Sequence, residues 1–350
     1  MAGPQTYSTQ AGRINEIKGE MIAHAVPHEV LALGVTMKEM PKNKGDNITY
    51  RRVLPTGGSS STANTINRWS VTAATHAVTE GVTPTPDVLT YHDVSKTIDQ
   101  YGVLYSYTDK AAMLYEDDIP GDQLQQTGER MGLVREMIRY GSMKAATSVY
   151  YSGGTTRPTV DEVVTLNFLR HITKVLKLNG ARMRNKVLAA SPDYDTSAIE
   201  AGYLVFCSTD LEPDIRDLPG FVPVAKYGSR KPINEHELGS CENFRFITSK
   251  ELIAYPDTGA AVAGTTNFST TGTNADVYPI LVMGEDAVFD IALRGESSVD
   301  PTHIPHKTKT KDDPHGQRGY VGAVFWSAVL VANPGWMAVG EVATTNTTPA

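Results

Sequence analysis

The sequence predicts an α+β protein whose outlying elements need other subunits, and three observations lead to this fold class. An N-terminal arm and a long polar ribbon carry too little apolar surface to fold by themselves. One amphipathic segment is long enough for a helix that spans a whole domain. Much of the remaining chain alternates short apolar strands with a helix, a pattern typical of a mixed α/β domain.

The composition is that of a globular chain. Its 350 residues are 40% hydrophobic and 20% charged, so it can bury a substantial core. The net charge of -7 argues against a dedicated nucleic-acid binder, although it allows a protein that encloses nucleic acid. The N-terminus lacks the apolar core of a signal peptide, and the longest apolar run, Tyr320–Ala332, is too short for a membrane span. We therefore expect no membrane partner and synthesis in a cytoplasm-like compartment.

The N-terminal segment is predicted to be an arm that lies along another surface. Its apolar residues recur at helical spacing until Pro27 interrupts the pattern, at Ile14, Ile17, Met21, Ile22 and Val26. Two strands follow, one in Lys44–Pro55 and one in Asp87–Gly102, and neither has a consistent apolar face. The Gly/Ser/Thr-rich stretch between them is longer than an ordinary connection, so we expect a functional ribbon that rests on a neighbouring subunit.

A helix of about 30 residues is predicted between Glu116 and the glycines at 153 and 154. Its N-terminal signals are Asp117, Asp118 and Pro120. The predicted buried stripe holds Leu124, Met131, Val134, Ile138 and Ala145. The predicted solvent-facing charges are Glu129, Arg130, Arg135 and Arg139. Three glycines within the helix require a closely packed neighbour, at Gly128, Gly132 and Gly141.

The mixed region starts near Asp161. An amphipathic helix is predicted over Thr165–Ala181, closing at Gly180. Gly316–Val342 is predicted to form one strand, and its nearly continuous apolar run indicates burial on both faces. Five shorter strands are expected, in Asn185–Ser191, Gly202–Ser208, Phe244–Ser249, Tyr278–Gly284 and Asp286–Gly295.

Catalytic and metal-binding motifs are missing from the sequence. The histidines at 303, 306 and 315 lack the spacing of a zinc site and are better explained as part of a basic surface loop. Cys207 and Cys241 have no metal-type spacing and are expected to be buried thiols. Asp210 and Asp214 could form a carboxylate pair, but no partner residues define a mechanism. We therefore predict neither an enzyme nor a cofactor. The charged stretch Ser208–Pro232 remains either a catalytic loop or a surface for another protein.

Six colinear blocks carry a resemblance to a known family. They are PKNKGDNITYRR at 41–52, VTEGVTP at 78–84, QYGVLYSYTD at 100–109, MIRYGSMKA at 137–145, DLEPDIRDLPGFVPVAKYGS at 210–229 and DPHGQRGYVG at 313–322. The chain resembles the major capsid proteins of tailed double-stranded DNA bacteriophages, which have the HK97 fold, in the branch typified by large podophages. The resemblance implies an N-arm (1–41), an E-loop β-hairpin (42–101), a P-domain with a long spine helix (102–160), an α/β A-domain (161–300) and a P-domain return strand with a C-terminal tail (301–350).

The implied function is structural. Such a protein self-assembles as hexamers and pentamers into an icosahedral shell that encloses the packaged double-stranded DNA, contacted without sequence preference. The expected location is the virion, after assembly in the host cytoplasm. An encapsulin-like cellular nanocompartment shell of the same fold is the alternative. Residues expected at contacts between subunits are Arg51, Arg52, Trp69, Asp214, Arg216, Asp217 and Lys226.

Other partners follow from the same resemblance. A portal and decoration proteins are expected partners of the shell. Some relatives carry a long scaffolding segment before the N-arm, whereas the candidate arm here begins within about fifteen residues of Met1. We therefore expect a separate scaffolding protein and no N-terminal cleavage. Lys42, Lys44 and Asn47 give no basis for a lysine–asparagine cross-link.

Overall fold

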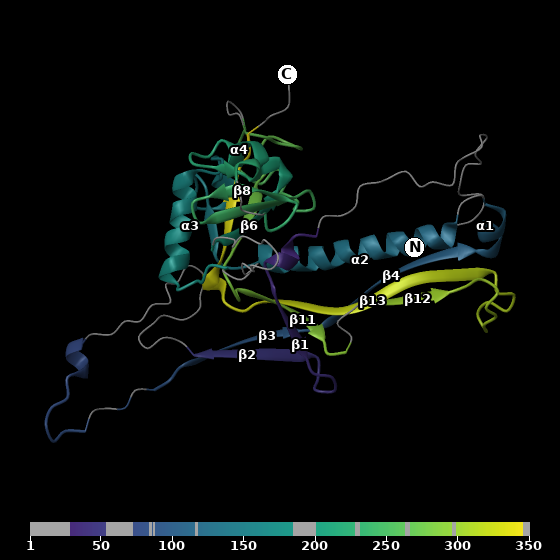
Figure 1. The fold of residues 1–350 in the computed structure, drawn as a ribbon, viewed down its shortest axis with the longest axis horizontal. Helices are drawn as coiled ribbons and strands as arrows, with labels where there is room; N and C mark the ends of the chain where they lie inside the picture. Colours follow the sequence, from purple (N-terminus) through teal and green to yellow (C-terminus); the bar gives the residue numbers. More distant parts are fainter. Residues whose placement is uncertain are drawn as a thin grey trace, which may run out of the picture.

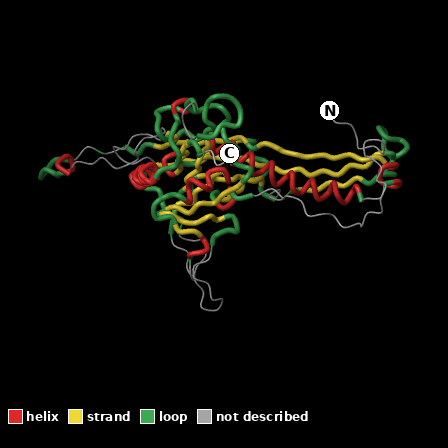
Figure 2. Tube along the Cα trace, turned by 90° about the horizontal axis from the view of Figure 1, so that it is seen from above, coloured by secondary structure: helices red, strands yellow, loops and turns green. Residues whose placement is uncertain are grey.

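The molecule is elongated, with an upper domain, a long helix on a sheet that extends to one side, and a strand ribbon that extends to the other (Figure 1). Seen from above, the helix lies along the long strands of the extended sheet (Figure 2). The computed structural model describes residues 29–53, 73–83, 86, 88–115, 118–184, 201–227, 232–262, 267–295 and 299–345.

The elements have the following bounds. The strands are β1 Thr36–Met40, β2 Asn47–Val53, β3 Tyr91–Thr97, β4 Asp99–Thr108, β5 Val149–Tyr151, β6 Tyr203–Ser208, β7 Val222–Pro223, β8 Glu237–Cys241, β9 Phe244–Ser249, β10 Tyr278–Met283, β11 Val288–Leu293, β12 Asp300–Ile304, β13 Arg318–Val331 and β14 Met337–Val342. The α-helices are α1 Asp109–Leu114, α2 Ile119–Lys144, α3 Leu166–Leu178 and α4 Glu212–Arg216. The 3-10 helices are η2 Leu31–Leu33, η3 Ala73–His76, η4 Arg157–Thr159, η5 Thr209–Leu211, η6 Val224–Lys226 and η7 Pro334–Trp336.

The upper domain is built on a seven-stranded sheet in the order β5-β14-β10-β6-β9-β8-β7. Every residue of β6, β9, β10 and β14 is buried. Helix α3 covers one face through Leu169, Ile172 and Leu176. The C-terminal end of α2 covers the other face together with η2, through Tyr140 and Met143. Both faces of this sheet are therefore covered by the chain itself.

Helix α3 confirms the prediction for this segment. The Thr165 hydroxyl accepts a hydrogen bond from the Phe168 N–H at 3.3 Å and so caps the first turn. The chain leaves the helix at Gly180, whose φ of +70° favours glycine. Cys207 and Cys241 are buried free thiols, as predicted. The strand predicted at Asn185–Ser191 lies outside the described residues.

The extended sheet has β13 at its centre. Strand β4 pairs with β13 along one edge, while β12 and then β11 pair with it along the other, and β1 adds to β11 in parallel. Alternate β13 residues face α2, among them Val321, Ala323 and Phe325. The intervening residues point to the opposite face, which we call the outer face. Helix α2, with 26 residues, is about 39 Å long and covers the inner face of this sheet.

The ribbon of β2 and β3 packs on part of that outer face. Ile48, Tyr50 and Val94 join a core with Trp326 and Leu330. The base of the ribbon therefore has an apolar face, contrary to the prediction from sequence, because Ile48 and Tyr50 alternate with exposed residues along β2. Most of the Gly/Ser/Thr-rich stretch lies outside the described residues.

The strand predicted over Gly316–Val342 is two strands in two sheets. Strand β13 belongs to the extended sheet and β14 to the upper one. Between them, the Asn333 side chain accepts a hydrogen bond from Gly335 N at 3.1 Å, in a turn that begins with Pro334. Strand β11 also lies in the extended sheet rather than in the upper one. The apolar run is nearly continuous across the turn, so the sequence pattern did not indicate that the chain passes from one sheet to the other.

Helix α2 ends earlier than predicted, and it packs Met131, Val134 and Ile138 against the sheet as predicted, but not Leu124 or Ala145. It stops at Lys144, because β5 follows before the glycines. Asp118 caps its N-terminus by accepting from Gly121 N at 3.3 Å. Arg139 is buried, whereas Leu124 is 53% exposed, so both were assigned to the wrong side. Of the three glycines, Gly132 has a close neighbour in Glu29, whereas Gly128 and Gly141 have none among the described residues.

The chain around Leu31 is part of the body, not a free arm. Val30 and Leu31 are fully buried in the core beneath the upper sheet, and β1 pairs with β11. The part of the predicted N-arm from Glu29 onward is therefore built into its own subunit, while residues 1–28 lie outside the described residues. No helix in the described ranges is long and apolar enough to cross a membrane.

Candidate intersubunit surfaces

The charged stretch that follows β6 is folded into short turns of helix at the top of the upper domain. Ser208 begins η5, Pro213 lies in the first turn of α4, and Gly220 adopts a φ of +82°. Serine, proline and glycine are typical of such turns, so local chemistry accounts for them. Residues 228–231, within the same stretch, lie outside the described residues.

The Asp214 carboxylate makes its hydrogen bonds within its own subunit. It is 8% exposed, and its carboxylate accepts hydrogen bonds from the Thr344 hydroxyl at 2.7 Å, the Thr345 hydroxyl at 2.7 Å and the Thr345 N–H at 3.0 Å. Asp214 therefore fastens the chain after β14 to α4. Its contact with another subunit stays a prediction, although three hydrogen bonds already engage it within its own chain.

The predicted carboxylate pair has no catalytic arrangement. Asp210 lies beside the Tyr278 hydroxyl. The pKa of Tyr278 is raised, mainly by burial and to a smaller extent by the negative charge of Asp210. The Asp214 carboxylate accepts hydrogen bonds from two threonines. Asp210 and Asp214 therefore both have structural roles. Among the described residues, no group of three or more histidine, cysteine or acidic side chains could hold a metal ion.

Arg216, Asp217 and Lys226 are exposed at the top of the domain. The Arg216 guanidinium donates from Nε at 3.0 Å and from Nη2 at 2.6 Å to Glu212 Oε1, one turn earlier in α4. Such an exposed pair contributes about 0–1 kcal/mol to folding, so its charges remain available to a partner. These three residues are still candidates for subunit contacts.

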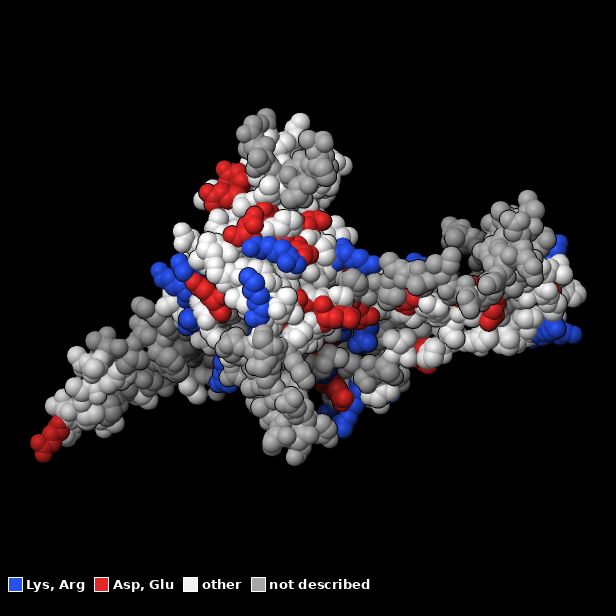
Figure 3. Space-filling model, turned by 45° about the horizontal axis from the view of Figure 1, so that its top comes forward, with Lys and Arg blue, Asp and Glu red and all other residues white. Residues whose placement is uncertain are grey.

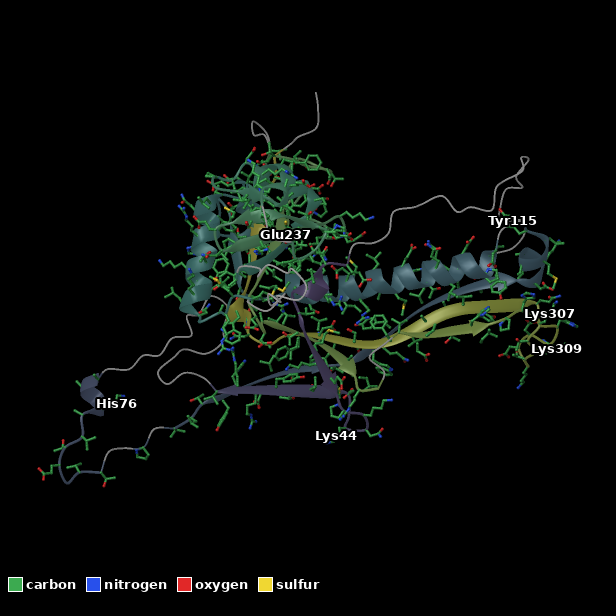
Figure 4. All side chains as sticks on the ribbon, in the orientation of Figure 1. Lys44, His76, Tyr115, Glu237, Lys307 and Lys309 are labelled. Carbon is green, nitrogen blue, oxygen red and sulfur yellow. The ribbon has the colours of Figure 1, made fainter. Side chains whose placement is uncertain are left out.

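Tyr227 and Ile233 are held by Glu237, which lies in the upper domain (Figure 4). This buried carboxylate accepts from the Tyr227 hydroxyl at 2.7 Å and from Ile233 N at 2.5 Å, and Arg245 lies at 3.3 Å. Burial is the main cause that raises the pKa of Tyr227 to about 12. The exposed charges above are therefore presented by a firmly supported loop.

The two ribbon arginines point in opposite directions. Arg51 faces outward and donates from Nε and Nη2, each at 2.7 Å, to the two carboxylate oxygens of Asp93 on β3. Arg52 faces inward, and its buried Nε and Nη2 have no hydrogen-bond partner among the described residues. Burial accordingly lowers the pKa of Arg52. Trp69, the third ribbon residue named from sequence, lies outside the described residues.

A second surface, which the sequence did not single out, lies at the far end of the extended sheet. Among the described residues, the ribbon covers β13 around Trp326, Ala328 and Leu330. Farther along the same outer face, Leu104 is 67% exposed and Ile304 is 40% exposed. Pairing places these two residues beside Gly322 and Tyr320 of β13. We call the outer-face residues Leu104, Ile304, Tyr320, Gly322 and Val324 the distal face.

The strand alternation of β4 is the signal that could have located the distal face. Tyr101, Val103 and Tyr105 point towards α2, while Gly102 and Leu104 point the other way. Beyond the distal face, Lys307 and Lys309 follow β12 at the same end of the molecule as Tyr115 (Figure 4). His303 lies 3.4 Å from the Tyr107 hydroxyl, and the His306 ring meets the Tyr107 ring edge-on. These histidines pack against an aromatic residue.

A cleft of about 510 Å³ beside β1 is lined by apolar residues together with Thr36, Arg184, Glu285 and Asp286. Its walls include Met37, Leu204 and Ile233. The Arg184 guanidinium at its side donates to the carbonyl oxygens of Leu33 and Val35 and so links the upper domain to the N-terminal segment. The visible face in Figure 3 shows acidic and basic side chains interspersed over the upper domain, without a broad basic area for nucleic acid.

Comparison with solved structures identifies the fold. The capsid protein of Ralstonia phage GP4 superposes with a TM-score of 0.62 over 96% of both chains, at 14% identity. The chain has the HK97-like fold of phage capsid proteins. The capsid protein of cyanophage Pam1 shares this capsid fold with a TM-score of 0.59 over 98% of both chains, also at 14% identity. The capsid protein of the mature capsid of bacteriophage PhiM1 superposes with a TM-score of 0.56, at 9% identity. The superposition covers 96% of this chain and 93% of that one.

A sequence comparison points to the same group of proteins. The chain is 21% identical over 262 residues to the major capsid protein of Pseudomonas phage KPP21. The match covers 69% of this chain and 65% of that relative, so about a third of the relative has no counterpart in it. A search against protein-family models found no match. The capsid fold therefore rests on the structure, and the sequence relationship is distant.

Proposed function

We propose that this chain is a phage major capsid protein that assembles as hexamers and pentamers into an icosahedral shell around packaged double-stranded DNA. The capsid fold over nearly the whole chain supports this, as does the distant match to a phage major capsid protein. The observation that carries the proposal is the pair of complementary ends. The ribbon projects from one end of the molecule, and the distal face lies uncovered at the other (Figure 1).

The two ends fit a head-to-tail contact. The ribbon already packs on the outer face of its own sheet, and its projecting end exposes Val53 by 52% and Tyr91 by 53%. The distal face continues the same sheet surface and exposes Leu104 and Ile304, with the polar cross-strand neighbours Ser106, Asp300 and Thr302 on the same side. When one copy covers the distal face of the next, each copy has one ribbon and one receiving surface, and such heterologous contacts form rings where the rotation between copies closes.

The family's domains map onto the two large sheets in this proposal. The ribbon with its connecting loop serves as the E-loop, and the extended sheet with α2 serves as the P-domain. The upper sheet with α3 serves as the A-domain, which includes β5 and β14 but not β11. Asp217 and Lys226 at its top are then placed to contact neighbouring A-domains.

The remaining partners are part of the same proposal. The protein is located in the virion after assembly in the host cytoplasm, acts without enzymatic activity, and works with a scaffolding protein, a portal and decoration proteins. Its contact with DNA is independent of sequence. Nothing in the fold or in the reported comparisons favours the alternative, a cellular nanocompartment shell.

The test is the oligomeric state of the purified full chain, by sedimentation velocity and negative-stain electron microscopy over a range of concentrations. We expect five- and six-membered rings or closed shells. A chain that stays monomeric at every concentration, with the circular dichroism of a folded protein, would refute the proposal. Particles that co-purify with a protein cargo rather than with DNA from infected cells would favour the nanocompartment.

A further inference from the structure

A buried glutamate on the long helix binds the start of the described chain. Glu136 has a side chain that is 1% exposed. Its Oε1 accepts hydrogen bonds from Val30 N and Leu31 N, both at 2.8 Å. These two residues are themselves fully buried. One carboxylate oxygen of α2 therefore holds the backbone of η2 and the residue before it.

Gly132, one turn earlier in α2, makes room for this contact. A side chain at this position would meet the end of the exposed Glu29 side chain, which would have to move aside. The N-terminal segment therefore crosses α2 at a site shaped by a glycine and held by a glutamate. This accounts for a glycine in the helix interior, where alanine would favour the helix by about 1 kcal/mol.

The charges around Glu136 do not balance. Its Oε2 has no hydrogen-bond partner among the described residues and lies 3.6 Å from Arg139 Nη1. That guanidinium is already engaged, because Nε and Nη2 donate to Asp290 Oδ2 on β11 at 2.9 and 2.8 Å. Glu29 Oε2 is a further 4.0 Å neighbour of Arg139. Three carboxylates thus share one cation in a site that excludes water from Glu136.

We propose that Glu136 is a proton-sensitive clamp, which fixes residues 29–31 on α2 and holds them more firmly when it carries a proton. A proton on Oε2 removes one negative charge from a site where, among the described residues, three carboxylates surround one guanidinium, while Oε1 still accepts from both backbone N–H groups. The charged groups that face it are Glu29 from the N-terminal segment, Arg139 from its own helix and, through Arg139, Asp290 from the sheet. The clamp thereby sets where the N-terminal segment leaves the body.

The direction of the pH effect follows from linkage. Burial is the largest influence on Glu136, and it raises the pKa of this carboxyl despite the opposing N–H donors and Arg139. A group whose pKa is raised in the docked state favours docking most at low pH, and this advantage is lost as the pH rises through the raised value. Docking of residues 29–31 should therefore weaken from mildly acidic to neutral pH.

Hydrogen–deuterium exchange of the peptide that contains Val30 and Leu31 tests the clamp, on the unassembled full chain from about pH 5 to about pH 8. After correction for the intrinsic exchange rate, protection in the wild type should fall as pH rises, by about tenfold for each unit of pKa shift. Glu136→Gln, which is neutral and isosteric, should give protection that does not depend on pH. Glu136→Ala should lose the protection at every pH. Glu129→Gln, an exposed-side change on the same helix, should behave like the wild type.

A second variant, at Gly132, changes the contact between residues 29–31 and α2 while leaving the Glu136 carboxylate in place. Gly132→Ala should strengthen the helix locally but displace Glu29, so protection of residues 29–31 should fall while protection of α2 does not. Wild-type protection in Glu136→Ala would refute the clamp. A wild-type profile that does not change with pH, identical to that of Glu136→Gln, would refute its sensitivity to protons. Both outcomes are independent of whether the chain forms a shell.

Discussion

The two large sheets differ in how completely the chain covers them. The upper sheet has α3 on one face and the end of α2 on the other, and four of its strands are buried throughout. The extended sheet has α2 on its inner face, but the ribbon covers only the proximal part of its outer face. The chain itself covers both faces of the upper sheet, whereas the described residues leave part of the outer face of the extended sheet exposed, and we propose that a second copy covers it.

This difference separates residues that fold the subunit from residues that assemble it. Leu330 and Val324 stand on the same strand and on the same outer face of β13. Leu330 is 5% exposed beneath the ribbon, while Val324 is half-buried on the distal face. A sequence pattern treats the two alike, since both belong to one apolar run. Their environments give them different roles.

The largest expected effect is at Leu330. Leu330→Asp places a carboxylate in a core of Ile48, Tyr50 and Trp326 without a partner, which costs several kcal/mol. We expect insoluble protein or a loss of the cooperative thermal transition, measured by circular dichroism. Leu330→Met, which keeps the volume approximately, is the control and should fold. A soluble and cooperatively folded Leu330→Asp variant would show that the ribbon does not seal this part of the sheet.

Removal of the projecting ribbon loop should have the next largest effect. A chain in which a short Gly/Ser link replaces residues 56–86 should keep its thermal transition, because the base of the ribbon supplies its packing to the subunit. Assembly should stop, since the receiving surface of the next copy stays empty. Sedimentation velocity with circular dichroism separates the two outcomes. Particles of normal heat resistance from this deletion would contradict a ribbon contact between subunits.

Val324→Asp is the matched counterpart of the Leu330 change. The new carboxylate can reach water on the distal face, so we expect a folded monomer with a nearly unchanged melting temperature. Assembly should fail, because the charge would have to be buried under a second copy's ribbon. Val324→Thr, of similar size and uncharged, should assemble at least partly. Failure of Val324→Asp to fold would mean that this end of β13 is as closed as the proximal end.

The fold could be predicted from sequence where local signals agree with tertiary contacts. Asp118 and Pro120 mark the start of α2, and Gly180 marks the end of α3. Met131, Val134 and Ile138 were predicted on the inner side of α2 and pack there. The buried charge of Arg139 could not be predicted, because it depends on remote partners. Arg139 is neutralised by Asp290, which lies 151 residues later in the chain. Periodicity alone assigns such an arginine to solvent.

The same reasoning applies to the candidate surfaces. The turns around Pro213 and Gly220 follow from local chemistry. The internal hydrogen bonds of Asp214 could not be predicted, because its partners, Thr344 and Thr345, lie more than a hundred residues away in sequence. Pro334 is a turn signal within an apolar run. The prediction followed the hydrophobic pattern instead and placed the whole run in one strand.

A substitution at Asp214 should have a smaller effect, and this effect should be on the stability of the single subunit. Asp214→Ala leaves the Thr344 and Thr345 donors without their acceptor, and a buried donor left unsatisfied costs about 1–3 kcal/mol. We expect a lower melting temperature and faster hydrogen exchange after β14. Asp214→Asn, which keeps one acceptor oxygen, should lose less. Asp217→Asn, a change three residues away on the surface, is the control and should leave the melting temperature unchanged.

The smallest expected effect belongs to the exposed charges of the upper domain. Arg216→Ala removes a pair with Glu212 that contributes about 0.2–0.5 kcal/mol to α4, so the subunit should fold as before. In a ring, a charge that meets an opposite charge on the neighbouring copy contributes more, and the contact is repeated at every interface. Arg216→Ala and Asp217→Ala should therefore lower the yield of rings without changing the circular dichroism. Their defect should shrink as added salt weakens the same contacts in the wild type, because exposed charge pairs are screened within about 10 Å at moderate ionic strength. Wild-type ring formation by both variants at low salt would show that these side chains are only solvated, and the upper domains would then have to meet through other residues.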